Sequence, residues 1–137
     1  MGVVPCANGA DGRALDISLS YADVNGDWSP ESVPVTMLCA NVPDSPDAPT
    51  LLLSALDLIL LEWDPPLYDG GSPILGYSVW LRQDSEPGYS LVYNGTQNPA
   101  TRTLAITEHN GLPLTISGYW IIVRAYNWVG VSPDTSL

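Results

Sequence analysis

The sequence of 137 residues has no phenylalanine, no lysine, a single histidine and two cysteines. It also lacks any run of about 18 apolar residues, which excludes a membrane-spanning helix. Four arginines stand against fifteen aspartates and glutamates, so the net charge is −11. Nucleic acids and anionic membranes are bound by clustered cations, and this chain has none, so we expect neither kind of partner nor insertion into a membrane.

Catalytic and metal-binding groups are also scarce. The only histidine, His109, lies in a Glu-His-Asn-Gly stretch that predicts an exposed turn. Two cysteines and one histidine are too few for a closed zinc site, and Asp44, Asp47 and Asp69 lack the spacing of a known calcium loop. No nucleophile has a base and an orienting group near it in the sequence. We therefore expect no enzyme activity, no metal site and no cofactor.

The composition that is present favours β-structure. Thirteen prolines and twelve glycines are distributed along the chain and separate short segments rich in β-branched and aromatic residues. The clearest segment is 119–127, in which successive side chains point to opposite faces. One row of that segment is predicted to face a core and consists of Tyr119, Ile121, Val123, Ala125 and Asn127.

This inward row, followed by Gly130 and Ser132, resembles the F strand of a fibronectin type III domain. The resemblance extends over residues 50–137 and includes an inward Trp63 and the Asp69–Ile74 loop. It implies an all-β, immunoglobulin-like sandwich in which the Tyr119 hydroxyl returns to backbone at a corner. The last strand would be cut short, and a strand donated by a neighbouring chain is the alternative to truncation.

The first part of the chain resembles the end of a preceding repeat. Residues 15–40 read as a hairpin with a turn at Asn25-Gly26, and Asn25 precedes Asn127 by 127 − 25 = 102 residues, the length of one repeat with its linker. We therefore expect a partial type III-like repeat at 1–40, contributing its last two strands as an F–G hairpin. A proline-rich, extended linker would follow at 41–49 and resembles the joints of tandem arrays in large protist surface proteins.

Two short features suggest a setting outside the cell. Cys6 and Cys39 fall at the same end of the partial repeat, so a disulfide between them is geometrically reasonable, with two free thiols as the alternative. Asn94-Gly95-Thr96 is an N-glycosylation sequon in a predicted turn. Together they favour an extracellular or cell-surface glycoprotein, with a cilium or the cytoskeleton as the alternative setting.

The outward row of 119–127 is unusually apolar. An exposed sheet face is expected to be polar, yet this row has one charged residue, Arg124, among large apolar side chains. Such surfaces mark protein partners, although ordinary cross-strand packing with Arg124 over a tryptophan ring is the simpler alternative. The predicted interface consists of Trp80, Trp120, Ile122, Tyr126 and Trp128.

The sequence thus predicts a non-catalytic structural module of a large filamentous protein. It would space neighbouring units and assemble laterally with copies or repeats of the same protein through the apolar row. Two alternatives use the same residues differently. The rings could stack on glycans in a carbohydrate-binding or cell-adhesion module, or the chain could belong to an intracellular ciliary or cytoskeletal scaffold.

Overall fold

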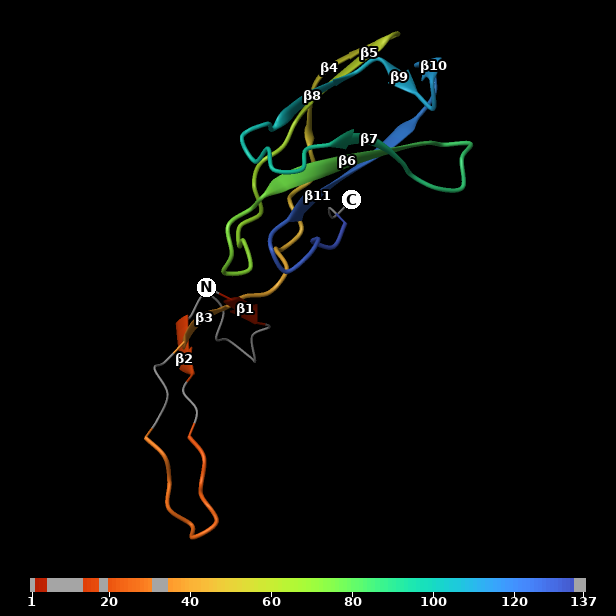
Figure 1. Cartoon of the computed structure of the whole chain (residues 1–137). Coiled ribbons are helices and arrows are strands. Elements are labelled where there is room, and N and C mark those ends of the chain that lie inside the picture. The colour runs from red at the N-terminus through yellow and green to blue at the C-terminus, as the bar shows by residue number, and fades with distance from the viewer. Residues whose placement is uncertain (1, 5–13, 18–19, 31–34, 135–137) are drawn as a thin grey trace.

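The structure is a computed structural model that describes residues 2–4, 14–17, 20–30 and 35–134. Every regular element among these residues is a β-strand, which confirms the predicted all-β class (Figure 1). A small sheet near the N-terminus precedes a two-sheet sandwich, and an extended segment connects them. In the described ranges there is no helix long and apolar enough to cross a membrane.

The N-terminal unit is a three-stranded sheet with the order β1-β3-β2. Strand β2 (Ala14–Ile17) pairs antiparallel with β3 (Val35–Cys39), and β1 (Gly2–Val4) adds to β3 in parallel. Between β2 and β3, residues 20–30 form a projecting hairpin end with a turn at Gly26, whose φ is +84°. That this unit belongs to a preceding repeat stays a prediction.

The first sheet of the sandwich has the order β4-β5-β8. It contains β4 (Thr50–Ala55), β5 (Leu58–Glu62) and β8 (Thr103–Ile106), all antiparallel. Strand β5 alternates between half-buried and buried residues and then ends in an exposed glutamate, as a period of two requires. Beside this sheet, β9 (Glu108–His109) and β10 (Leu112–Pro113) form a short hairpin.

The second sheet has the order β11-β6-β7. Strand β6 (Gly76–Gln83) lies in the centre, between β7 (Ser90–Asn94) and β11 (Tyr119–Tyr126), and both pairings are antiparallel. After β11 the chain turns back on the free side of that strand. Val131 forms a bridge with Tyr126, and the Ser132 N–H donates to the Ala125 carbonyl at 2.8 Å.

The core lies between the two sheets and is organised around Trp63. Its ring packs edge-on against Tyr77, with ring centroids 5.9 Å apart, and at a tilt against Tyr93 at 6.2 Å. Aliphatic side chains from both sheets fill the remaining space. The buried members are Ile59, Leu61, Val79, Leu81, Ile106, Leu114, Val123 and Ala125.

Tyr119 forms the corner at the start of β11. Its hydroxyl accepts a hydrogen bond from the Thr115 backbone N–H at 3.0 Å. A half-buried tyrosine ring carries its polar end to a backbone donor that the turn would otherwise leave unpaired. The corner hydrogen bond expected for Tyr119 is therefore present.

Candidate protein-interaction site

The outward row of β11 lies beside the outward row of β6. In the antiparallel register, Trp120 is opposite Arg82 and Ile122 is opposite Trp80. The next strand adds Leu91, which is opposite Trp80 on β7. Three neighbouring strands thus bring aromatic, aliphatic and arginine side chains onto one face of the sheet. We call Trp80, Trp120, Tyr126 and Trp128, with Arg82 and Arg124, the aromatic face.

Both arginines of this face lie over aromatic rings. The Arg124 guanidinium is 5.1 Å from the Trp80 ring centroid. The Arg82 guanidinium is 5.6 Å from the Trp120 ring and 5.4 Å from the Tyr89 ring. Guanidinium groups are attracted to the negative faces of aromatic rings, and each such contact contributes roughly 0.5–1 kcal/mol at exposed sites. These contacts restrict the motion of the arginine side chains and the rings.

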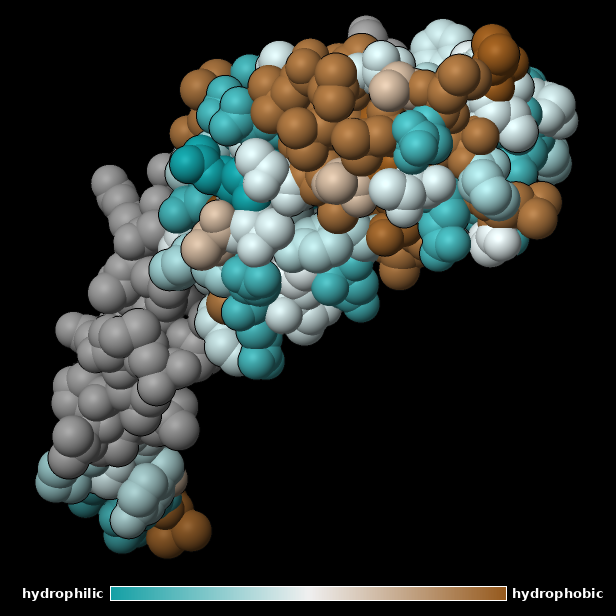
Figure 2. Space-filling view, turned by 90° about the horizontal axis from the view of Figure 1, so that it is seen from above, coloured by the Kyte–Doolittle hydropathy of each residue, from teal (hydrophilic) through white to brown (hydrophobic). Residues whose placement is uncertain are grey.

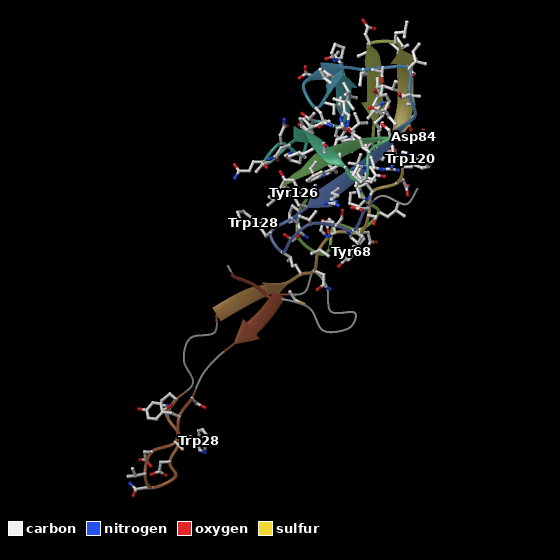
Figure 3. All side chains as sticks on the ribbon, turned by 90° about the vertical axis from the view of Figure 1, so that its right-hand side faces the viewer. Trp28, Tyr68, Asp84, Trp120, Tyr126 and Trp128 are labelled. Atoms are coloured by element: carbon white, nitrogen blue, oxygen red, sulfur yellow. The ribbon has the colours of Figure 1, made fainter. Side chains whose placement is uncertain are left out.

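Acidic and hydroxyl groups fix the orientation of these side chains. The Trp120 indole N–H donates to Asp84 Oδ1 at 2.6 Å, and these two side chains lie side by side in Figure 3. The Trp80 indole N–H donates to Ser78 Oγ at 3.1 Å. Arg124 Nε donates to Asp134 Oδ1 at 2.5 Å. The face is therefore preorganised, which lowers the entropy lost when a partner binds.

The members of the predicted interface differ in exposure. Trp128 and Trp120 are 70% and 43% exposed, and they lie toward opposite ends of β11 (Figure 3). Trp80 and Tyr126 are half-buried. Ile122 is only 2% exposed, so its predicted place on the contact surface is wrong. The large side chains around it on the same face, Trp80, Trp120 and Arg124, exclude solvent from this small central residue.

A shallow apolar hollow of about 280 Å³ lies beside these rings. Trp80 and Tyr126 supply aromatic walls, and polar side chains lie on the β7 side, including Asn94 and Thr96. The lining residues are Ser78, Trp80, Leu91, Asn94, Thr96, Tyr126 and Val131. The hollow offers a place for a side chain of a partner protein or for a small ligand.

Arg82 and Asp84 were not identified from the sequence as parts of this site. Arg82 occurs two residues after Trp80 and therefore shares its face, so the period of two alone identifies it. Asp84 lies beyond the end of β6, and its contact with Trp120 joins residues 36 positions apart. No local pattern in the sequence indicates that contact.

A second apolar surface lies on strand β4. Its residues are exposed along the whole strand, including Leu51, Leu52 and Leu53. Figure 2 shows apolar side chains gathered on the sandwich seen from the side where β4 and β5 lie in Figure 1. A groove of about 400 Å³ runs between the end of β4 and residues 114–119. Strand β4 is an edge strand and pairs only with β5 among the described elements, which leaves these leucines uncovered.

His109 differs from the predicted exposed turn residue. Its side chain is buried, and Nε2 lies 2.5 Å from Glu86 Oε2. Asn110 donates to the other carboxylate oxygen, Glu86 Oε1, at 2.7 Å. The hydrogen bond with His109 is the largest cause of a lowered Glu86 pKa, followed by a hydrogen bond from the Gln83 backbone N–H. The pair connects the turn after β6 to β9, so it is structural.

The structure describes the predicted disulfide and glycosylation sites only in part. Cys39 is buried and disulfide-bonded, but Cys6 lies outside the described residues, so the Cys6–Cys39 pairing stays a prediction. Asn94 is exposed, and its side-chain oxygen accepts a hydrogen bond from the Thr96 hydroxyl at 2.5 Å. Its glycosylation also stays a prediction. Within the described part of the chain, no group of three or more His, Cys, Asp or Glu side chains is arranged to hold a metal ion.

Comparison with known proteins places this geometry in context. No model of a known protein family matches the chain. Over an alignment of 68 residues, this chain is 40% identical to cardiac-type myosin-binding protein C of Gallus gallus. This match covers 43% of this chain and 5% of the relative. The chain therefore spans about a twentieth of the length of that relative.

Solved structures of titin have the same fold. Domains A168–A170 of titin align with a TM-score of 0.62 and 24% identity, covering 80% of this chain and 34% of theirs. Titin module A71 from human cardiac muscle aligns with a TM-score of 0.56 and 24% identity, covering 69% of this chain and 86% of the module. At this level of identity, the alignments show a shared fold.

These relatives overturn the predicted extracellular or cell-surface setting. Myosin-binding protein C and titin are intracellular sarcomeric proteins. The expectation rested on a three-residue sequon, a pair of cysteines and the resemblance to a type III array, and none of these features determines a compartment. The two-sheet sandwich of this chain has the fold of fibronectin type III domains.

Proposed function

We propose that this chain is a structural module of a filament-associated tandem-repeat protein and that it associates laterally with copies of itself through the aromatic face. The carrying observation is the preorganised row of rings, which leaves Trp120 and Trp128 exposed at opposite ends of β11. Tryptophan and arginine are among the residues enriched in protein interfaces. We place the module inside the cell, as the sarcomeric relatives suggest.

The test is sedimentation velocity of the purified chain over a range of concentrations. The parent chain is expected to self-associate, and Trp128→Glu and Trp120→Glu are expected to remain monomeric, because a buried, unpaired carboxylate opposes association. The matched control is Trp28→Glu. Trp28 is 71% exposed and lies on the projecting hairpin, far from the aromatic face (Figure 3).

Thermal unfolding of each variant shows whether the monomer stays folded. If Trp120→Glu and Trp128→Glu associate like the parent while remaining folded, the aromatic face is not the contact. If Trp28→Glu alone abolishes association, the hairpin end is the contact instead. A parent chain that stays monomeric throughout the accessible concentrations contradicts association between copies.

Carbohydrate binding is the second candidate, and the hollow is the observation that favours it. Two aromatic rings and the polar groups of Ser78, Asn94 and Thr96 border the same space. Sugars are bound by rings that stack on their apolar faces and by hydrogen-bonding groups at the edge. A glycan-binding assay on monomeric Trp128→Glu, which leaves the hollow intact, separates this activity from self-association.

A further inference from the structure

The linker between the two units packs against the sandwich instead of crossing solvent. Pro43 and Pro46 are fully buried, while Asp44 and Asp47 between and after them are exposed. The Asn41 N–H donates to the Gly70 carbonyl at 2.8 Å, and the Asp44 N–H donates to the Tyr68 carbonyl at 3.0 Å. Two backbone hydrogen bonds therefore attach residues 41–44 to the loop between β5 and β6.

Asn127 connects this linker to the sandwich. Its amide Nδ2 donates to the Asn41 carbonyl at 2.7 Å and to the Asp69 carbonyl at 2.8 Å. Its amide oxygen accepts hydrogen bonds from the backbone N–H groups of Val129 and Gly130. An asparagine side chain has two donor hydrogens and two acceptor lone pairs, so all four are used. One buried side chain thus joins the linker, the β5–β6 loop and the turn after β11.

The glycines at this position allow the close approach. Gly70 has φ of +81°, and a Cβ on it would overlap the carbonyl oxygens of Asn41 and Val42. On the other side, a Cβ on Gly130 would come within 3.1 Å of Val42 Cγ1. Backbone positions without a side chain are needed where two chain segments lie this close.

No exposed residue separates strand β3 of the N-terminal unit from the linker residues that contact the sandwich. Strand β3 ends at Cys39, which is buried and disulfide-bonded. The next residue, Ala40, is completely buried, and the one after it, Asn41, already bonds to the sandwich. A swivel between domains needs an exposed residue with free φ and ψ, and the chain has none at this junction.

We propose that the amide donor of Asn127 fixes the orientation of the N-terminal unit relative to the sandwich, so that the two move as one rigid body. Asn127 is a positioning residue for the joint formed by residues 40–46. This inference rests on the part of the proposed function that makes the chain a structural module of a tandem-repeat protein, and it does not depend on lateral association. In a tandem array such a joint would set a constant angle between successive units.

The decisive variant is Asn127→Asp. It keeps a side-chain oxygen for the Val129 and Gly130 N–H groups and removes both donated hydrogen bonds. It also places a carboxylate beside two carbonyl oxygens, so the linker is expected to leave this surface. The control, Asn98→Asp, introduces the same charge at an exposed asparagine in the loop after β7.

The measurement is residual dipolar couplings of backbone amides in weakly aligned, monomeric protein. In the parent chain and Asn98→Asp, one alignment tensor is expected to fit both units. In Asn127→Asp, the couplings of the N-terminal unit are expected to shrink while those of the sandwich keep their pattern. Two independent tensors in the parent, or a single tensor in a folded Asn127→Asp, would overturn the proposal.

A second variant keeps the test valid if Asn127→Asp does not fold. Insertion of two glycines between Ala40 and Asn41 leaves every contact of Asn127 in place but supplies the missing swivel. The couplings of the N-terminal unit are expected to shrink in this variant as well. If they match those of the parent, the joint does not transmit orientation. Because the experiment uses monomers, a failed joint and a failed aromatic face are distinguished.

Discussion

At the scale of single residues, His109 and Asn127 take structural roles. His109 and Asn110 both bind the Glu86 carboxylate, which ties the turn after β6 to the hairpin of β9 and β10. Asn127 uses every hydrogen-bonding position of its amide at the joint. The contacts with Glu86 and the two hydrogen bonds that Asn127 donates join segments distant in sequence, so they constrain the tertiary structure. The two hydrogen bonds that Asn127 accepts stabilise the local turn after β11.

The lowered pKa of Glu86 predicts how the free energy of unfolding depends on pH. Its pKa lies below the ordinary value of 4.5, chiefly because of the hydrogen bond with His109. A carboxyl group with a depressed pKa in the folded state stabilises the protein above its unfolded-state pKa, and this stabilisation is lost as the pH falls through the folded-state pKa. The free energy of unfolding should therefore decrease with acid below about pH 4.5, and less steeply in Glu86→Gln.

Urea unfolding of the parent and of Glu86→Gln at a series of pH values from 6 downward measures this difference. The two curves of unfolding free energy against pH should converge toward low pH, where the carboxyl group is protonated in both folded and unfolded states. Parallel curves would show that the contact between Glu86 and His109 does not contribute through ionisation.

At the scale of elements, one face of the β11-β6-β7 sheet has an internal organisation of its own. Arginines cover rings and acids orient both, so part of the outward row is buried although it points away from the sandwich core. The face therefore has a central, solvent-excluded residue, Ile122, with exposed tryptophans toward its ends. This arrangement resembles the well-packed centre and open rim of protein interfaces.

The burial of Ile122 predicts its energetic role. Ile122→Ala is expected to lower the free energy of unfolding by about 2–4 kcal/mol, because it leaves a cavity beneath the neighbouring rings. Trp128→Ala removes an exposed ring and should change stability by no more than about 0.5 kcal/mol. Urea unfolding followed by far-UV circular dichroism measures both. A loss for Ile122→Ala as small as that for Trp128→Ala would place Ile122 at the surface after all.

At the scale of the whole molecule, two kinds of contact act in different directions. The joint at residues 40–46 relates units along the chain, and the aromatic face offers a surface to the side. Strand β11 takes part in both, since it carries Trp120 and Arg124 and leads directly into Asn127. A structural repeat that both spaces and associates can build an extended assembly, provided that the joint keeps one angle.

Substitution of Gly70 tests whether the linker packs closely against the β5–β6 loop. Gly70→Ala introduces a Cβ that overlaps two linker carbonyl oxygens, at a position where φ is +81°. The matched control is Gly111→Ala, where φ is +77° and nothing lies within 4 Å of the added Cβ. Both variants incur the strain of a left-handed alanine, about 1–2 kcal/mol. Differential scanning calorimetry should show a larger drop in Tm for Gly70→Ala, and equal drops would mean that the linker does not press on this loop.

Much of the fold was predictable because it depends on local patterns. The alternation over 119–127 predicts a strand and correctly assigns Val123 and Ala125 to the core. The Tyr119 corner and the buried Trp63 follow from resemblance to a known domain. The outward position of the tryptophans also follows from the period of two. These features require only which way successive side chains point.

Ile122, His109 and the linker could not be predicted in the same way. Ile122 is buried because Trp80 stands opposite it on another strand, and His109 is buried because Glu86 approaches from 23 residues away. The linker is extended, as its prolines indicate, but its attachment depends on an asparagine 86 residues further along. The sequence by itself determined the strands, their inward rows and the domain type, because these follow from periodicity and local chemistry. Only the tertiary structure decided burial on the outer face and the fixing of the joint, because both depend on register and on contacts between distant segments.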